Sequence, residues 1–166
     1  GVARIDITDW EAYEINLNNR LGLDNQLSRV LGNKARRDPK RIVFADAENS
    51  KILKAAQSAF EEKVAFPILL GNEKRINEIA EMHQLDISGM SIINPHDDEN
   101  EDIRLQFGNI FFEKRQRKGL NKYEATKLMK ERNHFGCMMV ETGMADGMIS
   151  GLSKNYPDAI RPALQI

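Results

Sequence analysis

The chain has 166 residues and a formal net charge of −1, and this length suits one domain with a buried core. Its nearly balanced charge does not favour general binding to nucleic acid or to an anionic membrane surface. The single cysteine, Cys137, excludes a disulfide within the chain and suits a cytoplasmic, reducing setting. No signal peptide is recognisable, and no apolar run approaches the roughly 18 residues that a membrane span needs.

A helix is predicted to begin near Asp9, because Thr8–Glu11 form a capping box. Gly22 is its predicted end. An isolated helix of this length is marginal in water, so its apolar face needs a partner. We expect that partner to be the domain itself, a second copy or a catalytic domain in a longer chain. The apolar face consists of residues that recur at helical spacing: Trp10, Tyr13, Leu17 and Leu21.

Residues 22–40 favour a linker that is partly ordered by a few apolar side chains. We interpret its basic side chains as solvated, and contact with the phosphates of a nucleotide is the alternative. The chain therefore divides into an N-terminal helix with its linker, residues 1–37, and an α/β domain, residues 38–166. The apolar side chains of the linker are Leu27, Val30 and Leu31.

Short β-rich runs at residues 41–45, 66–70 and 91–93 predict three strands, and amphipathic segments between them predict two helices. Asn49 or Ser50 should cap the first helix, and Asn72 should cap the second. This alternation predicts a parallel-rich sheet with helices on both faces. The carboxyl ends of its strands would gather polar residues at one edge, where α/β proteins bind ligands. These residues are Asp46, Glu48, Gly71, Asn94 and the loop after Ser150.

The middle of the chain predicts two further helices and no metal site. Residues 96–102 are acidic, but their spacing does not fit a calcium loop, and a solvated loop is the better interpretation. A helix should follow over residues 102–118, ended by Gly119. Asn121 and Glu124 form a capping box for a helix over residues 122–132. His134 is interpreted as a buried structural histidine, because no cysteine or serine nucleophile lies at motif spacing nearby.

The last 31 residues predict an anion site. Cys137–Val140 is a continuous apolar run that predicts a strand buried on both faces, and the apolar pattern resumes over Met148–Ser150. Gly151 opens a polar loop, and a helix should follow over residues 158–166 with Arg161 on its first turn. Backbone N–H groups at a helix start and an arginine fork both suit phosphate or carboxylate.

The sequence ADGMISG, a short loop and then DAIRPALQI resemble the phosphotransacetylase family. The similarity is greatest to the phosphotransacetylase-like domain at the C-terminus of NADP-dependent malic enzymes. The loop LSKNYP over Leu152–Pro157 carries this distinction, because stand-alone acetyltransferases typically have a histidine followed by small hydroxylated residues here. The resemblance covers residues 38–166, about half of the family's domain, and implies a fold like that of phosphotransacetylase and isocitrate dehydrogenase.

The resemblance also implies a site for phosphate or acyl-CoA. Arg115, in the segment EKRQRKG, and Arg161 match two arginines that the family uses in its ligand site. No catalytic residue and no metal ligand are expected in this half. The base that activates the CoA thiol, and most of the CoA surface, are expected after Ile166. The complete set of implied site residues is Arg115, Arg161, Ser150, Gly151, Ser153, Lys154, Asn155 and Tyr156.

By resemblance, the chain is expected to be a regulatory and assembly part of an NADP-dependent malic enzyme that senses acetyl-CoA and is inactive alone. NADP and a divalent metal ion would bind in the malic-enzyme catalytic domain of the same chain, and the protein would be a homo-oligomer. One alternative is part of an active phosphate acetyltransferase, which would convert acetyl-CoA and phosphate to acetyl phosphate and CoA. The other is an oligomerisation module that binds no ligand.

Overall fold

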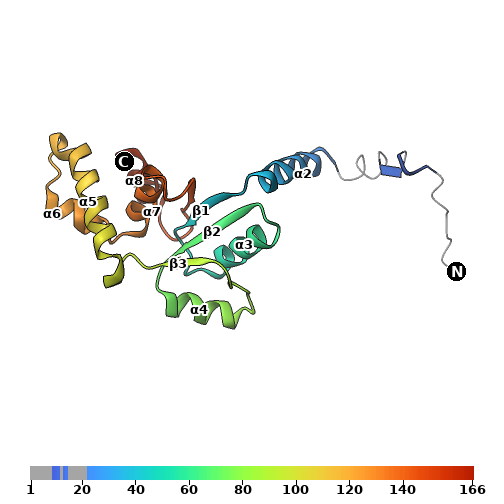
Figure 1. Ribbon diagram of the computed structural model, residues 1–166, viewed down its shortest axis with the longest axis horizontal. Helices are drawn as coiled ribbons and strands as arrows, with labels where there is room; N and C mark the ends of the chain where they lie inside the picture. The colour runs from blue at the N-terminus through green and yellow to red at the C-terminus, as the bar shows by residue number, and fades with distance from the viewer. Residues whose placement is uncertain (1–8, 12, 15–21) are drawn as a thin grey trace.

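The protein is built on a four-stranded parallel sheet, as a computed structural model shows for residues 9–11, 13–14 and 22–166 (Figure 1). The strand order is β3-β2-β1-β4. Strand β1 pairs with β2 in the register Val43 to Ile68, and with β4 in the register Val43 to Met148. The first three strands confirm the predicted positions within one residue at each end. The bounds are β1 (Lys40–Phe44), β2 (Ala65–Leu70), β3 (Ser91–Ile93) and β4 (Gly147–Ile149).

Helices cover both faces of the sheet, which confirms the predicted fold class. Successive side chains of a strand point to opposite faces. Val43 packs into one hydrophobic cluster, and the next residue, Phe44, packs into the other. Strand β2 shows the same alternation, with Leu69 opposite Ile68 and Leu70. Because both faces are covered, β2 is apolar at every position, and β1 is apolar from Ile42 onward, after the charged Lys40 and Arg41.

Helices α3 (Ser50–Glu61) and α4 (Glu73–Met82) follow β1 and β2 and pack on one face. Asn49 accepts a hydrogen bond from Lys51 N–H at 2.9 Å and so caps α3. Asn72 caps α4 by accepting from Arg75 N–H at 3.1 Å. Both predicted caps are confirmed, because an N-cap is a contact between residues that lie close in sequence.

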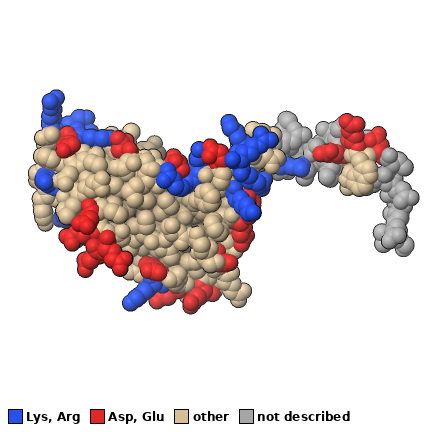
Figure 2. Space-filling view, in the orientation of Figure 1, with Lys and Arg blue, Asp and Glu red and all other residues tan. Residues whose placement is uncertain are grey.

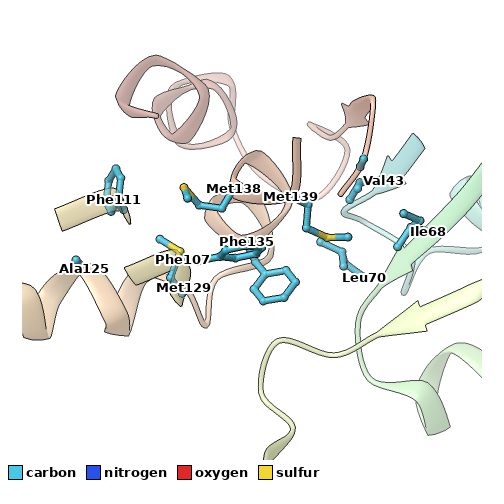
Figure 3. Close-up of a cluster of buried hydrophobic side chains, with 11 residues drawn as sticks. Val43, Ile68, Leu70, Phe107, Phe111, Ala125, Met129, Phe135, Met138 and Met139 are labelled. Carbon is cyan, nitrogen blue, oxygen red and sulfur yellow. The ribbon is translucent and has the colours of Figure 1, made fainter. Parts of the chain in front are cut away.

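The other face carries the larger cluster, which Figure 3 shows between the sheet and the C-terminal helices. Phe107 and Phe135 pack ring against ring at 5.1 Å between centroids. The capping box of Asn121 and Glu124 is confirmed. The helix that it begins ends at residue 128, four residues earlier than predicted. The helices on this side are α5 (Glu101–Arg115), α6 (Lys122–Leu128), α7 (Arg132–Glu141) and α8 (Tyr156–Gln165).

The predicted strand at Cys137–Val140 is wrong, because this run lies inside helix α7. A helix that is surrounded by core on all sides is apolar all round, so its sequence resembles that of a doubly buried strand. Gly136 allows α7 to lie close to the sheet. A Cβ at this position would come within 2.5 Å of Met148 Sδ and 3.2 Å of Val43 Cγ1.

The predicted linker contains helix α2 (Gly22–Arg37), which extends away from the sheet in Figure 1. Gly22 is therefore helical and does not end a helix. The base of α2 is tied to the domain by Arg36, whose Nε donates to Glu62 O at 2.9 Å. Arg41 forms an ion pair with Asp146. Figure 2 shows the basic side chains gathered where α2 meets the domain, and these ion pairs favour a structural role for them.

A helical turn begins at Asp9, as predicted, since Tyr13 N–H donates to Asp9 O at 3.1 Å. The rings of Trp10 and Tyr13 meet edge to face at 6.1 Å. The other predicted contact positions, Leu17 and Leu21, lie outside the described residues.

The acidic segment at residues 96–102 forms a turn and the 3-10 helix η1 (Asp98–Asn100). The buried Arg104 secures it by donating to Pro95 O at 2.8 Å and to Asp97 O. Among the described residues, no group of three or more His, Cys, Asp or Glu side chains could hold a metal ion. In the same part of the chain, no helix has both the length and the apolar character needed to cross a membrane.

Candidate functional site

The loop after β4 meets the end of β1 at the point where the order of the strands reverses. The chain leaves β1 to build β2 and β3 on one side and later returns to add β4 on the other. The crevice between two such strands, beyond their carboxyl ends, is the usual ligand position in open α/β sheets. Asp46 follows β1 and Ser150 follows β4, so both lie at this crevice.

Asp46 already occupies the backbone donors of this loop. Its carboxylate accepts from Gly151 N–H at 3.0 Å and from Leu152 N–H at 3.1 Å, and the hydroxyl of Ser153 also donates to it. The N–H groups of Gly151 and Leu152 therefore donate to the protein itself and not to an external anion. An internal carboxylate takes the place that the sequence suggested for a ligand.

The Asp46 carboxyl is held in its charged form. It is only 5% exposed, and burial by itself would raise its pKa. The hydrogen bonds from Ser153, Leu152 and Gly151, together with the charge of Arg132, outweigh burial and lower the pKa below its ordinary value. The loop is thus fixed to the sheet by a charge-assisted hydrogen-bond network.

Ser150 connects the same loop to helix α7. Its hydroxyl donates to Asn133 Oδ1 at 3.0 Å. Asn133 is 2% exposed, and its Nδ2 makes no hydrogen bond within the described residues. Ser150 and Gly151 therefore hold the loop in place through hydrogen bonds to Asn133 and Asp46.

A cleft of about 660 Å³ contains four of the predicted site residues, Ser153, Lys154, Asn155 and Arg161. We call it the Arg161 cleft. Asn155 begins α8 by accepting from Asp158 N–H at 3.1 Å, and this cap confirms a helix start close to the predicted one. Arg161 is exposed and has no ion-pair partner among the described residues. Its guanidinium is available to an anion.

His134 also lines the Arg161 cleft, which the sequence did not predict. The ring is 6% exposed and neither nitrogen makes a hydrogen bond with good geometry in the described residues. Burial lowers its pKa, against opposing effects from Gln165 and Glu131, so the ring is neutral at pH 7. Its edge-to-face contact with Phe111, at 5.9 Å between centroids, fixes the ring plane.

A second cleft of about 570 Å³ lies beyond the ends of β1, β2 and β3. Glu48, Gly71 and Asn94 line it, which confirms that these predicted residues gather at one edge of the sheet. We call it the lysine cleft, because its cations outnumber its carboxylates. The charged residues that define it are Lys127, Lys130, Arg132 and Lys154, with Glu48 and Glu131.

The two clefts share one wall, the ion pair between Lys154 Nζ and Glu131 Oε2 at 3.0 Å. Arg115 lies half-buried at the end of α5 and is not among the residues that line either cleft. Tyr156 is 77% exposed at the start of α8 and also lies outside both linings. Their proposed ligand roles remain predictions.

Lys127 and Lys130 were missed because nothing in their sequence distinguishes them from solvated residues at the end of helix α6. The role of Asp46 was missed for another reason. Its partners are more than 100 residues away in the chain, and only the register of β1 against β4 brings them together.

Known proteins match this chain over most of its length. The family model described as "Phosphate acetyl/butaryl transferase" matches residues 26–166. A phosphate acetyltransferase of Thermoanaerobacterium thermosaccharolyticum is 39% identical over 133 residues, which are 80% of this chain and 39% of that protein. An NADP-dependent malic enzyme of Rhizobium meliloti is 34% identical over 164 residues, which cover 96% of this chain and 21% of that protein.

The fold is also similar to that of solved structures. The EutD phosphotransacetylase from Staphylococcus aureus has a TM-score of 0.73 and 34% sequence identity, covering 85% of this chain and 42% of that one. The chain therefore spans about two fifths of the length of these two proteins.

Proposed function

Because the chain belongs to the phosphate acetyl/butaryl transferase family, we propose that it is the ligand-sensing part of a phosphotransacetylase-like domain in an NADP-dependent malic enzyme. The ligand is acetyl-CoA or another phosphate-bearing small molecule. Its binding regulates the oxidative decarboxylation of malate to pyruvate. A catalytic domain of the same chain carries out that reaction and holds NADP and a divalent metal ion. The proposal places the protein in the cytoplasm, as a homo-oligomer.

One observation carries this proposal. The alignment with the malic enzyme covers 96% of the chain, whereas the alignments with the acetyltransferases of Thermoanaerobacterium thermosaccharolyticum and Staphylococcus epidermidis cover 80% and 76%. The larger aligned part of the chain favours the interpretation that residues 1–37 form a junction with a malic-enzyme domain.

The Arg161 cleft supplies the chemistry for binding. Arg161 and Lys154 offer cationic donors, and Ser153 and Asn155 offer neutral polar groups beside them. Arginine binds phosphate through two parallel N–H groups, so Arg161 is suited to a phosphate of the ligand. The loop that carries Ser153, Lys154 and Asn155 is already fixed by Asp46, which reduces the entropy lost when a ligand binds.

Catalysis by this chain alone is not part of the proposal. Acyl transfer from acetyl phosphate to CoA needs a base that forms the CoA thiolate, because the thiolate is the nucleophile that attacks the acyl carbon and releases phosphate. The Ser153 hydroxyl donates to the Asp46 carboxylate, but this carboxylate also accepts from two backbone N–H groups, so the contact is assigned to fixing the loop. Cys137 cannot serve, because burial raises its pKa to about 11.

A second candidate is part of an active phosphate acetyltransferase, which the higher identity of 39% to such an enzyme favours. Acetyl phosphate formation from acetyl-CoA and phosphate, assayed with the full-length protein that carries this sequence, separates the two. The regulatory proposal predicts acetyl phosphate at the background level of an enzyme-free control. Rapid formation of acetyl phosphate would replace it with the acetyltransferase function.

A further inference from the structure

We propose that the lysine cleft is a second anion subsite, which binds a phosphate group next to the Arg161 cleft. This goes beyond the proposed function, because it assigns a separate cleft and three cations, Lys127, Lys130 and Arg132, that no part of that function uses. The subsite is formed by the end of α6, the turn into α7 and the loop after β4, over the carboxyl ends of the strands.

Both carboxylates of the lysine cleft are already engaged. Glu48 Oε1 accepts from Asn72 N–H at 3.0 Å, and its carboxylate lies 3.5 Å from Nη1 of Arg75 and 3.5 Å from Nη1 of Arg132. Glu131 pairs with Lys154 at 3.0 Å and lies 3.8 Å from His134 Nδ1. These contacts leave little carboxylate charge to neutralise the remaining cations.

Lys127 and Lys130 have no ion-pair or hydrogen-bond partner for their ammonium groups in the described part of the chain. A tight turn holds them together, since Lys130 N–H donates to Lys127 O at 3.1 Å. Both side chains are exposed and line the same cleft. Like charges that face one space repel, and an anion between them removes that repulsion.

Arg132 adds an incompletely satisfied guanidinium. Its Nη1 is buried and lies 3.5 Å from Glu48 Oε1, but makes no hydrogen bond within the described residues. The side chain is still 30% exposed and lines the cleft. Its charge also acts on Asp46, where it lowers the pKa of that carboxyl. A buried donor without an acceptor is costly, so a ligand oxygen that draws the guanidinium toward the cleft would be stabilised.

Phosphate is the anion that this arrangement fits best. Its several oxygens carry at least one full negative charge, so one group can contact several ammonium and guanidinium groups together. The shared wall of Lys154 and Glu131 places the subsite directly beside the Arg161 cleft. The phosphate can therefore be a free phosphate ion or a second phosphate group of the ligand in the Arg161 cleft.

The test is a titration of the chain with inorganic phosphate, followed by backbone amide NMR shifts at residues 127–132. The double variant Lys127→Gln/Lys130→Gln should bind phosphate about tenfold more weakly than the natural chain, as expected if two exposed cations contribute modestly each. The matched control is Lys118→Gln/Lys122→Gln, which removes the same charge from exposed positions outside the cleft and should bind as the natural chain does. The variant Lys127→Arg/Lys130→Arg should retain binding.

Equal phosphate affinity in the double variant and its control would overturn the proposal. Titration with CoA and with dephospho-CoA, which lacks the 3′-phosphate, identifies the source of the phosphate. A preference for CoA that disappears in the Lys127→Gln/Lys130→Gln variant assigns the subsite to the ligand's own phosphate. No preference, together with lost binding of inorganic phosphate in that variant, assigns it to the free ion.

The variant Arg161→Gln separates this proposal from the proposed function. It should weaken acetyl-CoA binding and leave the inorganic phosphate shifts at residues 127–132 unchanged. If Arg161→Gln has no effect on acetyl-CoA while the lysine variant weakens phosphate binding, the proposed function fails and the second subsite stands.

Discussion

At the scale of single residues, the position of the loop after β4 depends on its hydrogen bonds to Asp46. We predict that Asp46→Asn lowers the free energy of unfolding by about 1–3 kcal/mol, because the loop donors lose a charged acceptor and an amide N–H₂ group faces them instead. Urea unfolding at pH 7 measures this change. Asp98→Asn is the matched control, since Asp98 is exposed and its side chain makes no ion pair in the described chain. Equal unfolding of both variants would contradict a role for Asp46 in stability.

The lowered pKa values of two carboxyl groups predict that acid destabilises the fold. The hydrogen bonds and charge of Arg41 lower the pKa of Asp146 to about 2, and the pKa of Asp46 is also lowered. A carboxyl with a lowered folded pKa stabilises the fold above its unfolded value of 3.8. That stabilisation is lost as the pH falls from about 4 to about 2. Urea midpoints measured across this range should fall with pH, and less steeply in Asp146→Asn. A slope unchanged by that substitution would contradict this account.

The pKa of the His134 ring should lie below its ordinary value. Because the ring is buried, protonation is disfavoured in the folded state, and NMR titration of its ring protons should give a midpoint below 6.5. The unfolded chain then binds a proton more readily than the folded chain. His134 therefore reduces stability as the pH falls below about 6.5. A midpoint at or above 6.5 would show that the Glu131 and Gln165 contacts outweigh burial.

At the scale of elements, the helix caps were predicted correctly from nearby residues, whereas the fully buried helix α7 was not. The helix caps at Asn49, Asn72 and Asn121 are contacts within three residues, so the sequence alone identifies them. Helix α7 was mistaken for a strand, because an apolar run that is buried all round has no polar face to reveal its period. Helix α2 was missed because its apolar residues are few, and Leu27, Val30 and Leu31 are exposed, so they form no buried face.

Helix α7 lies so close to the sheet at Gly136 that this position should not tolerate a larger side chain. We predict that Gly136→Ala destabilises the protein by about 1–3 kcal/mol, because the added methyl would overlap Met148 and crowd Val43. Gly32→Ala is the control. Its added Cβ would meet only the flexible Arg36 side chain, at 3.6 Å, and alanine is the better helix former. Thermal unfolding of both variants tests this, and a Gly136→Ala midpoint at or above that of Gly32→Ala would refute the close packing.

At the scale of the whole molecule, the sequence predicted the parallel sheet and the edge where ligand residues gather. Alternation of strands and helices fixes that edge without any side-chain detail. The clefts themselves could not be predicted. Whether Lys130 or Arg115 faces a cleft depends on how α5, α6 and α7 pack, and no local pattern records that packing.

The most direct test of the regulatory account is malate-dependent reduction of NADP by the full-length protein that carries this sequence. We predict that the protein turns over malate, that acetyl-CoA lowers the rate, and that Arg161→Gln relieves this inhibition without changing the rate in the absence of acetyl-CoA. The relief is expected because Arg161 lies in the proposed ligand cleft and has no ion-pair partner in the described chain. Malate turnover that is absent, or that does not respond to acetyl-CoA, would contradict the account.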